Sequence, residues 1–252
     1  MPSITVKLAG AVASVLAVSP LAYAQNLIPG GDFSAGLAAF ETDYQIVSQL
    51  DVDEGTLNVF DTGDVYRTFP AVEVVGPDHT TGDGAQLVVN GSPDAGTSVL
   101  RFRANVPRAG RYTVSIYYTN TSFGSRGNDA ELGILVDGSQ IGETVRTRPA
   151  GIWDAWLKLE REITLAAAGP VVVEVFEASG QRSGNDFALD DFSLVETCRA
   201  DLDADGVLTL FDFLAFGVLY DVGSPLADFD GDGSLTIFDF LAFQNAFDLG
   251  CP

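Results

Sequence analysis

The chain has 252 residues, enough for two domains, and carries 13 basic and 35 acidic side chains for a formal net charge of −22. This excess of acid, without a cluster of Lys and Arg, excludes a nucleic-acid surface and binding to anionic membranes. The acid is concentrated at the C-terminus, where ten Asp and a single base, Arg199, follow Cys198.

The first 24 residues are predicted to be a signal peptide. Lys7 is the only charge before an apolar run over residues 8–21, and Ala22-Tyr23-Ala24 is the small-x-small pattern at which signal peptidase cuts. The run is too short and too rich in alanine for a good membrane span, with an uncleaved anchor as the alternative interpretation. We therefore expect cleavage between Ala24 and Gln25, and a secreted, extracellular or cell-surface protein with no membrane span.

Residues 25–197 are predicted to form an antiparallel β-sandwich or jelly roll without a long helix. Glycine is frequent, and short runs either alternate apolar with polar side chains or are rich in β-branched residues. The pair Asp137-Gly138 after one run is a hairpin signal. The predicted strands cover residues 100–106, 112–118, 132–136, 157–160 and 171–176.

The two ends of this segment carry motifs of a known fold family. Residues 26–36 read NLIPGGDFSAG and residues 185–194 read NDFALDDFSL, and this pair resembles the first and last strands of galactose-binding-like jelly rolls, including several families of carbohydrate-binding module. The run GRYTVS at 110–115 and Trp156 before a strand support the resemblance. It implies a galactose-binding-like sandwich with a carbohydrate ligand.

The same resemblance implies one calcium ion where the terminal strands meet. Asp32 and Asp191 are at the matching positions, with Asp78 or Asp83 as a third donor. Ordinary turn acids are the alternative interpretation of these residues.

Sugar binding requires an exposed aromatic ring beside polar groups. The candidates are Tyr44, Tyr66, Tyr117 and Trp153, whereas Trp156 is expected in the core.

The sequence contains no catalytic signature. It has no nucleophile elbow, no HExxH, no phosphate-binding loop and one histidine, His79. Asp190 and Asp191 are adjacent in a predicted strand and should point to opposite faces, which is wrong for a cooperating acid and base. We therefore expect a non-catalytic protein. The alternatives are a passive surface-matrix protein without a ligand, and a polysaccharide-active enzyme subunit.

The C-terminal segment contains a duplicated unit. Residues 201–223 (DLDADGVLTLFDFLAFGVLYDVG) match residues 228–250 (DFDGDGSLTIFDFLAFQNAFDLG) at an offset of 27 positions. Each unit begins with a 12-residue loop that has oxygen donors at the positions an EF-hand uses, followed by a predicted helix. The predicted calcium ligands are Asp201, Asp203, Asp205, Val207 (through its carbonyl), Thr209 and Asp212 in loop 1, and Asp228, Asp230, Asp232, Ser234, Thr236 and Asp239 in loop 2.

The donor set of these loops favours calcium, one ion in each. So many carboxylates in a short segment require a cation if the segment is to fold compactly. All donors are oxygens and the only histidine, His79, is far upstream, so zinc and copper are poor candidates. A solvated acidic turn is the alternative for one loop, but two complete loops at a fixed offset favour a metal site.

Position 12 of both loops is Asp, and no helix is predicted before either loop. Together with the run FDFLAFQNAFD, the terminal Gly250-Cys251-Pro252 and the framing Cys198, residues 198–252 closely resemble a GC-type dockerin, a module found at the C-termini of exported bacterial proteins. The resemblance implies a module of two repeats, each a calcium loop plus a helix, that folds with calcium. It also implies docking onto a cohesin-like or other surface protein, although the aromatic content differs from that of cellulosomal dockerins.

Cys198 and Cys251 bracket this module. An even number of cysteines in an exported chain predicts a disulfide between them, with two unrelated thiols as the alternative. Such a bridge would stabilise the module by about 4 kcal/mol in the chain-entropy model.

Eight of the 17 Phe residues follow Cys198. Phe211 and Phe238 are predicted to point outward as symmetry-related contacts for a partner. The alternative is that they pack against each other or on the sandwich. The predicted lining of the two-helix core consists of Leu210, Phe213, Leu214, Ile237, Phe240 and Leu241.

Overall fold

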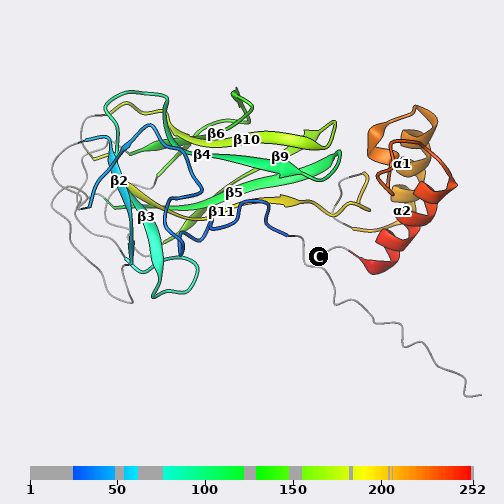
Figure 1. Ribbon diagram of the computed structural model, residues 1–252, viewed down its shortest axis with the longest axis horizontal. Helices are drawn as coiled ribbons and strands as arrows, with labels where there is room; N and C mark the ends of the chain where they lie inside the picture. Colours follow the sequence, from blue (N-terminus) through cyan, green and yellow to red (C-terminus); the bar gives the residue numbers. More distant parts are fainter. Residues whose placement is uncertain are drawn as a thin grey trace, which may run out of the picture.

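The computed structural model describes residues 25–48, 54–61, 76–121, 129–147, 155–181, 184–203, 205 and 207–250. In these residues the chain forms a β-sandwich followed by a helical tail at one end of the sheets (Figure 1). The prediction of a mainly β fold with a small helical C-terminal part is confirmed. The predicted signal peptide lies outside the described residues, and no helix among those described is long and apolar enough to span a membrane.

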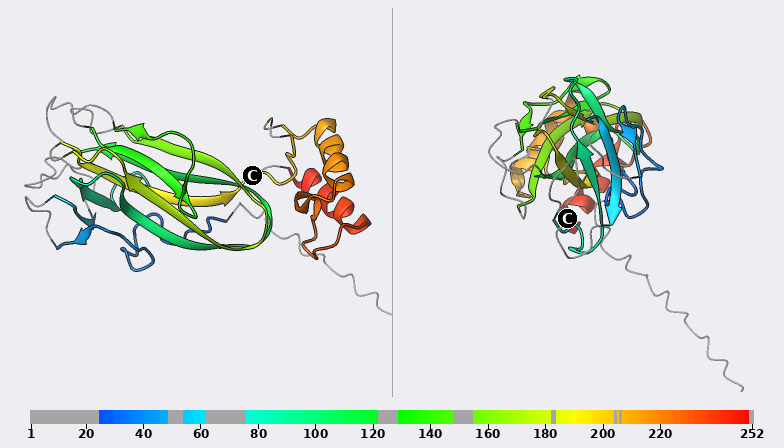
Figure 2. Two further views of the ribbon diagram at one scale, coloured as in Figure 1. Left: turned by 90° about the horizontal axis from the view of Figure 1, so that it is seen from above. Right: turned by 90° about the vertical axis from the view of Figure 1, so that its left-hand side faces the viewer.

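The described strands form two sheets that lie face to face (Figure 2). In order across the first sheet, the strands are β1 (Gln45–Ile46), β2 (Thr56–Asp61), β3 (Ala85–Asn90), β11 (Phe187–Glu196), β5 (Gly110–Asn120) and β9 (Leu157–Leu165). The second contains β4 (Thr97–Val106), β10 (Gly169–Glu177), β6 (Glu131–Val136) and β7 (Ser139–Gln140), with β8 (Val145–Arg146) also beside β6. β1 and β2 are parallel, and the other described pairs are antiparallel.

The alternation of side chains along the strands explains where the sandwich core lies. In β5, Tyr112, Val114 and Ile116 are fully buried between the sheets. Asp137 and Gly138 have φ of 48° and 77°, the left-handed conformations of a tight hairpin turn, and they connect β6 to β7 as predicted. All five predicted strands lie within described strands, whereas β2 and β3 were not predicted.

The first predicted strand is wrong in detail, because residues 26–36 form turns instead. Gly30 and Phe33 have φ of 76° and 54°, which an extended strand does not allow. The segment still runs beside β11, since Leu27 N donates to Leu194 O at 2.8 Å and Phe192 N donates to Gly31 O at 2.9 Å. A Cβ at Gly31 would lie 1.9 Å from Phe192 O, so only glycine permits this approach.

The tail consists of α1 (Leu210–Asp221), the short 3₁₀ helix η1 (Pro225–Ala227) and α2 (Ile237–Leu249). Both α-helices start with the same capping box, Thr209 with Asp212 and Thr236 with Asp239. Each acidic loop is therefore followed by a helix, as the duplicated sequence predicts, but the prediction that no helix precedes either loop is wrong for loop 2, which directly follows η1.

The tail core is built from other residues than most of those predicted. Phe216 and Phe243 stack at its centre, with ring centroids 4.7 Å apart, and Phe229 packs edge-on to Phe243 at 5.2 Å. Phe213 and Phe240 are partly buried against them, as predicted. The prediction is wrong for four aliphatic residues, which are 51–71% exposed: Leu210, Leu214, Ile237 and Leu241.

Helix geometry and ring size explain the difference. At 100° per residue, positions 213, 216 and 220 lie on one side of α1, and positions 210, 211, 214 and 218 lie on the other. Both sides are apolar, so hydrophobicity alone does not choose between them. The side of α1 that carries three rings, Phe213, Phe216 and Tyr220, faces the core, because these rings can remove more apolar area from water than the one ring and the aliphatic side chains of the other side.

Replacing a central ring should therefore destabilise the tail selectively. Phe243→Ala is expected to reduce its free energy of unfolding by about 3–5 kcal/mol, because the ring is fully buried. The matched control on α2 is Phe238→Ala, which removes a ring that is 63% exposed and should change stability by less than about 0.5 kcal/mol. Helix content followed by circular dichroism during thermal unfolding measures both. Equal effects of the two substitutions would contradict the described core.

Candidate functional site

Acidic side chains converge at two places in the tail. In loop 1, ligand atoms of Asp201, Asp203 and Asp212 lie within 4.8 Å of one another, and in loop 2 the same holds for Asp228, Asp230 and Asp232. Each group belongs to one of the predicted calcium loops. Among the described residues these are the groups of three potential metal ligands that converge in this way.

The last acid of each loop also starts the following helix. Asp212 is fully buried and accepts hydrogen bonds from Leu202 N and Thr209 N, both at 2.7 Å. Asp239 is equally buried and accepts from Asp230 N at 3.2 Å and Thr236 N at 2.7 Å. Position 12 thus ties the start of the loop to the first turn of the helix. Thr209 and Thr236, predicted as ligands, cap the helices with their side chains.

Like charges act on each other within the loops. Desolvation, together with the nearby carboxylates of Asp205, Asp212 and Asp201, raises the pKa of Asp203 above its ordinary value. Desolvation also acts to raise the pKa of Asp239, but amide donors, including Thr236 N and Asp230 N, outweigh it and hold this pKa below its ordinary value. Amide donors therefore stabilise the anion at position 12, whereas the one amide that donates to Asp203, Asp205 N at 3.2 Å, does not offset desolvation and the neighbouring carboxylates.

The donor chemistry fits a hard divalent cation. The converging atoms are carboxylate oxygens, and no nitrogen or sulfur ligand belongs to either group. Calcium accepts six to eight oxygens at about 2.3–2.6 Å, and two or three carboxylates per ion are typical of such loops. Asp205, Val207 and Ser234 are exposed at the same loops and can supply further oxygens, whereas Asp239 lies outside the converging group of loop 2.

Each of the two helices has an exposed apolar side, and these two sides are together called the paired apolar face here. Its members fall into pairs at the repeat offset of 27 and are 51–71% exposed: Leu210 with Ile237, Phe211 with Phe238, and Leu214 with Leu241. The outward orientation predicted for Phe211 and Phe238 is thus observed, and their contact with a partner remains a prediction. Clustered exposed apolar side chains of this kind mark interaction sites.

Cys198 is disulfide-bonded, and none of the described cysteines is free. Its predicted partner, Cys251, lies outside the described residues, so the pairing itself remains a prediction.

The sandwich has an open pocket of about 620 Å³ on the side of β5, β9 and β11. This volume is within the range of about 300–1,000 Å³ typical of small-molecule sites. Tyr117 of β5 and His79 stack in its wall with ring centroids 3.6 Å apart, and the Lys158 ammonium is 5.8 Å from the Tyr117 ring. Asp32 and Asp191, the predicted calcium residues of the sandwich, line the same pocket.

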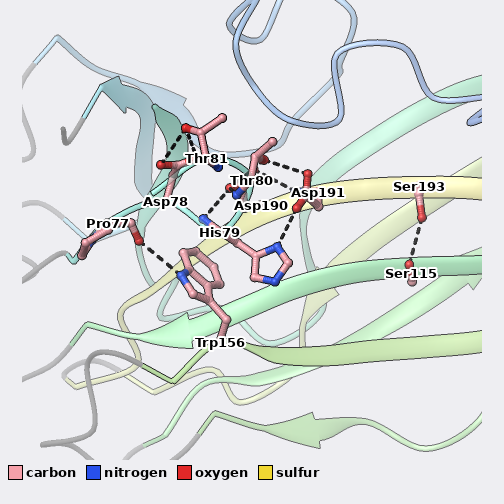
Figure 3. A network of polar contacts seen from close by, with 10 residues as sticks. All are labelled: Pro77, Asp78, His79, Thr80, Thr81, Ser115, Trp156, Asp190, Asp191 and Ser193. Atoms are coloured by element: carbon pink, nitrogen blue, oxygen red, sulfur yellow. Dashed lines mark hydrogen bonds and ion pairs between the residues drawn. The ribbon is translucent and has the colours of Figure 1, made fainter. Parts of the chain in front are cut away.

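A polar network holds His79 in place (Figure 3). His79 Nδ1 is 2.6 Å from Asp191 Oδ2, and Thr80 Oγ1 donates to Asp191 Oδ1 at 2.7 Å. Behind them, Asp190 Oδ2 accepts from His79 N at 2.8 Å and from Thr80 N at 3.1 Å. The histidine was not predicted as a site residue, because a single His gives no motif.

The expectation that Asp190 and Asp191 point to opposite faces is wrong. The pairing of β11 with β5 is irregular between Asp190 and Ser193, and Asp191 has φ of 50°. This bulge turns both carboxylates toward the loop of His79 and Thr80. Asp190 is nevertheless fully buried and cannot touch a ligand, so the two acids do not form a pair across the pocket.

The remaining predicted site residues of the sandwich lie elsewhere. Asp78 is buried and closes its own loop by accepting from Gly84 N at 2.6 Å, and Asp83 is exposed outside the pocket. Tyr44 is only 5% exposed, which rules out a role as a stacking ring. Trp156, expected in the core, is half-buried beside His79, and its Nε1 donates to Pro77 O at 3.2 Å. Tyr66 and Trp153 lie outside the described residues.

The sequence of this chain has limited similarity to known proteins. No model of a protein family matches it. A 1,6-alpha-glucosyltransferase of Sporosarcina globispora is 30% identical over 97 residues, which are 38% of this chain and 7% of that enzyme. The chain thus spans a small fraction of the length of this relative.

Several of the similar solved structures are carbohydrate-binding modules. TmCBM61, solved with beta-1,4-galactotriose, covers 68% of this chain and 99% of its own, with 16% identity and a TM-score of 0.44. A family 35 module from Clostridium thermocellum covers 55% and 90%, with 17% identity and a TM-score of 0.35. The CBM22-1 xylan-binding domain from Paenibacillus barcinonensis covers 62% and 92%, with 12% identity and a TM-score of 0.37. TM-scores and identities this low do not indicate a ligand for this chain.

Asp190 should make sandwich stability depend on pH. Burial, followed by the charge of Asp191, raises its pKa from 3.8 to about 6. The folded state therefore binds the proton more tightly than the unfolded state, and stability falls as pH rises from about 4 to about 6, by at most about 3 kcal/mol.

Asp190→Asn should flatten this part of the profile, because Asn does not titrate. Denaturant unfolding followed by tryptophan fluorescence between pH 4 and pH 7, with chelator present, measures the free energy of unfolding of the wild type and of the variant at each pH. A variant profile parallel to that of the wild type would contradict the buried, raised-pKa acid.

Proposed function

We propose that this protein is a secreted, non-catalytic binding protein whose tail is a dockerin-like module that binds two calcium ions and docks onto a cohesin-like or other surface protein. The observation that carries the proposal is the duplicated convergence of three carboxylates in each loop, each followed by a helix that contributes to the paired apolar face. Calcium would neutralise the loops and fix the helices, and the helices would present that face.

The chemistry of the paired apolar face suits one kind of partner. After Arg199 the tail has no basic residue, so the face is surrounded only by acids and neutral groups. A complementary surface is apolar at its centre and basic at its rim. The six exposed side chains are large enough to act as anchors when a partner covers them.

We further propose that the sandwich binds carbohydrate in the pocket of Tyr117. The supporting observation is the combination of an aromatic wall, Tyr117 with His79, with carboxylate, ammonium and hydroxyl groups from Asp191, Lys158 and Ser193. An aromatic face beside convergent polar groups is the usual composition of a sugar site. A third calcium ion at Asp32 and Asp191 would compete with the hydrogen bonds that Asp191 forms with His79 and Thr80.

Calcium uptake and docking can be tested together on the full chain. Calorimetric titration is expected to show two calcium ions per chain with a gain in helix content, and binding to immobilised cohesin modules is expected only without chelator. The double variant Phe211→Ser/Phe238→Ser should keep both ions and lose at least tenfold in affinity for the bound cohesin, since both rings are exposed. Absence of calcium uptake would refute the docking proposal, as would unchanged affinity of the double variant.

Sugar binding can be tested on a glycan array. A ligand is expected, and Tyr117→Ala should weaken its affinity at least tenfold, about 1.4 kcal/mol, because the variant lacks the ring in the pocket wall. Tyr220→Ala on α1 is the matched control and should bind like the wild type. If no glycan binds, the passive surface-matrix interpretation replaces this proposal.

A further inference from the structure

The tail is joined to the sandwich through a segment that hydrogen-bonds to β5. Thr197 N and Thr197 Oγ1 both donate to Arg111 O at 2.9 Å. Beside them, Arg108 forms an ion pair with Glu196, with Nε–Oε1 and Nη2–Oε2 distances of 3.0 Å. Loop 1 therefore begins directly beside the end of the sheet.

A side chain of the sandwich reaches into loop 1. Arg111, which belongs to β5, donates from Nη2 to the backbone carbonyl of Asp201, the residue at position 1 of the loop. The carbonyl of the first predicted calcium ligand is thus fixed by a residue from outside the tail.

Loop 2 has a matching contact from within the tail. Arg199 donates to Asp228 O and to Phe229 O, both at 2.5 Å, and its guanidinium carbon lies 4.1 Å from the centre of the Phe229 ring. Burial lowers the pKa of Arg199 to about 10, so it remains charged at neutral pH. The position-1 carbonyls of both loops are therefore bound by a guanidinium, but the two arginines come from different parts of the chain.

We propose that Arg111 and Arg199 are positioning residues for the calcium loops and make the loops unequal. Loop 1 reaches its full calcium affinity only while the tail packs against the sandwich, because Arg111 belongs to the sandwich. Loop 2 does not depend on this packing, because Arg199 belongs to the tail. The inference rests on calcium binding by the loops, as in the proposed function.

Preorganisation is the physical reason. Fixing the backbone at position 1 holds the carboxylates of Asp201 and Asp203 near Asp212 before an ion arrives, which lowers the ordering cost of binding. The guanidinium also repels a cation, and the two effects have opposite signs, since repulsion alone would make calcium binding by loop 1 stronger in Arg111→Ala.

Calcium titration of the full chain with one loop disabled tests the inference. Asp232→Ala disables loop 2 and leaves loop 1 intact, and Asp203→Ala disables loop 1 and leaves loop 2 intact, because each removes one of the three converging carboxylates. Adding Arg111→Ala should weaken calcium binding about tenfold in the first background and less than twofold in the second. Arg103→Ala is the matched control, because this arginine pairs with Glu41 on the sandwich.

A second variant separates loss of the anchor from damage to the fold. Three glycines inserted between Thr197 and Cys198 leave every native side chain present but move loop 1 away from Arg111. The insertion should weaken loop 1 as Arg111→Ala does, and combining the two should give no further loss.

Three results would overturn the inference: unchanged or stronger calcium binding by loop 1 in Arg111→Ala, equal weakening of both loops, or additive effects of the two changes. If the unmodified chain takes up no calcium, the proposed function itself fails. If two ions bind and neither affinity depends on Arg111, the proposed function stands and the proposed difference between the loops is refuted.

Discussion

Repulsion among clustered carboxylates is the constraint on which the tail depends. In each loop, ligand atoms of three acids lie within 4.8 Å of one another. The segment after Cys198 has one basic residue, Arg199, and its guanidinium donates to backbone carbonyls. Backbone amides donate to the buried acids at position 12 and also to other loop carboxylates, such as Asp203 and Asp228, but an amide carries no net charge and does not neutralise them. In the proposed function, a divalent cation in each loop would supply the missing positive charge.

Position 12 links this charge to the rest of the tail. Asp212 and Asp239 are at once the last loop acids and the N3 residues of the helix caps. The helices in turn place Phe216 against Phe243 in the core, and Leu210, Phe211 and their repeat partners on the surface. In the proposed function, neutralisation of the loops, helix formation and presentation of the paired apolar face would therefore be parts of one folding event.

In the sandwich, a local irregularity creates the site. The bulge in β11 and the positive φ of Asp191 bring an acid to His79, and this pair orients an imidazole ring against Tyr117. In a regular strand Asp191 would point away from this loop. The pocket therefore depends on backbone geometry as much as on residue type, and Asp190 supports it from the interior without facing a ligand.

The sequence by itself determined the sandwich class, the position of its alternating strands, the duplicated loops and the helix after each loop. These features follow from local patterns: side-chain alternation, turn residues, capping residues and an exact repeat offset. The tertiary structure alone decided which apolar side of α1 and α2 faces inward, because both sides are hydrophobic and they differ in how well their rings pack together in the tail core. It also decided that His79 contacts Asp191 and that Arg111 donates to the Asp201 carbonyl of loop 1. These residues are far apart in the sequence and become neighbours only when the sheet has formed and the tail has packed against its end.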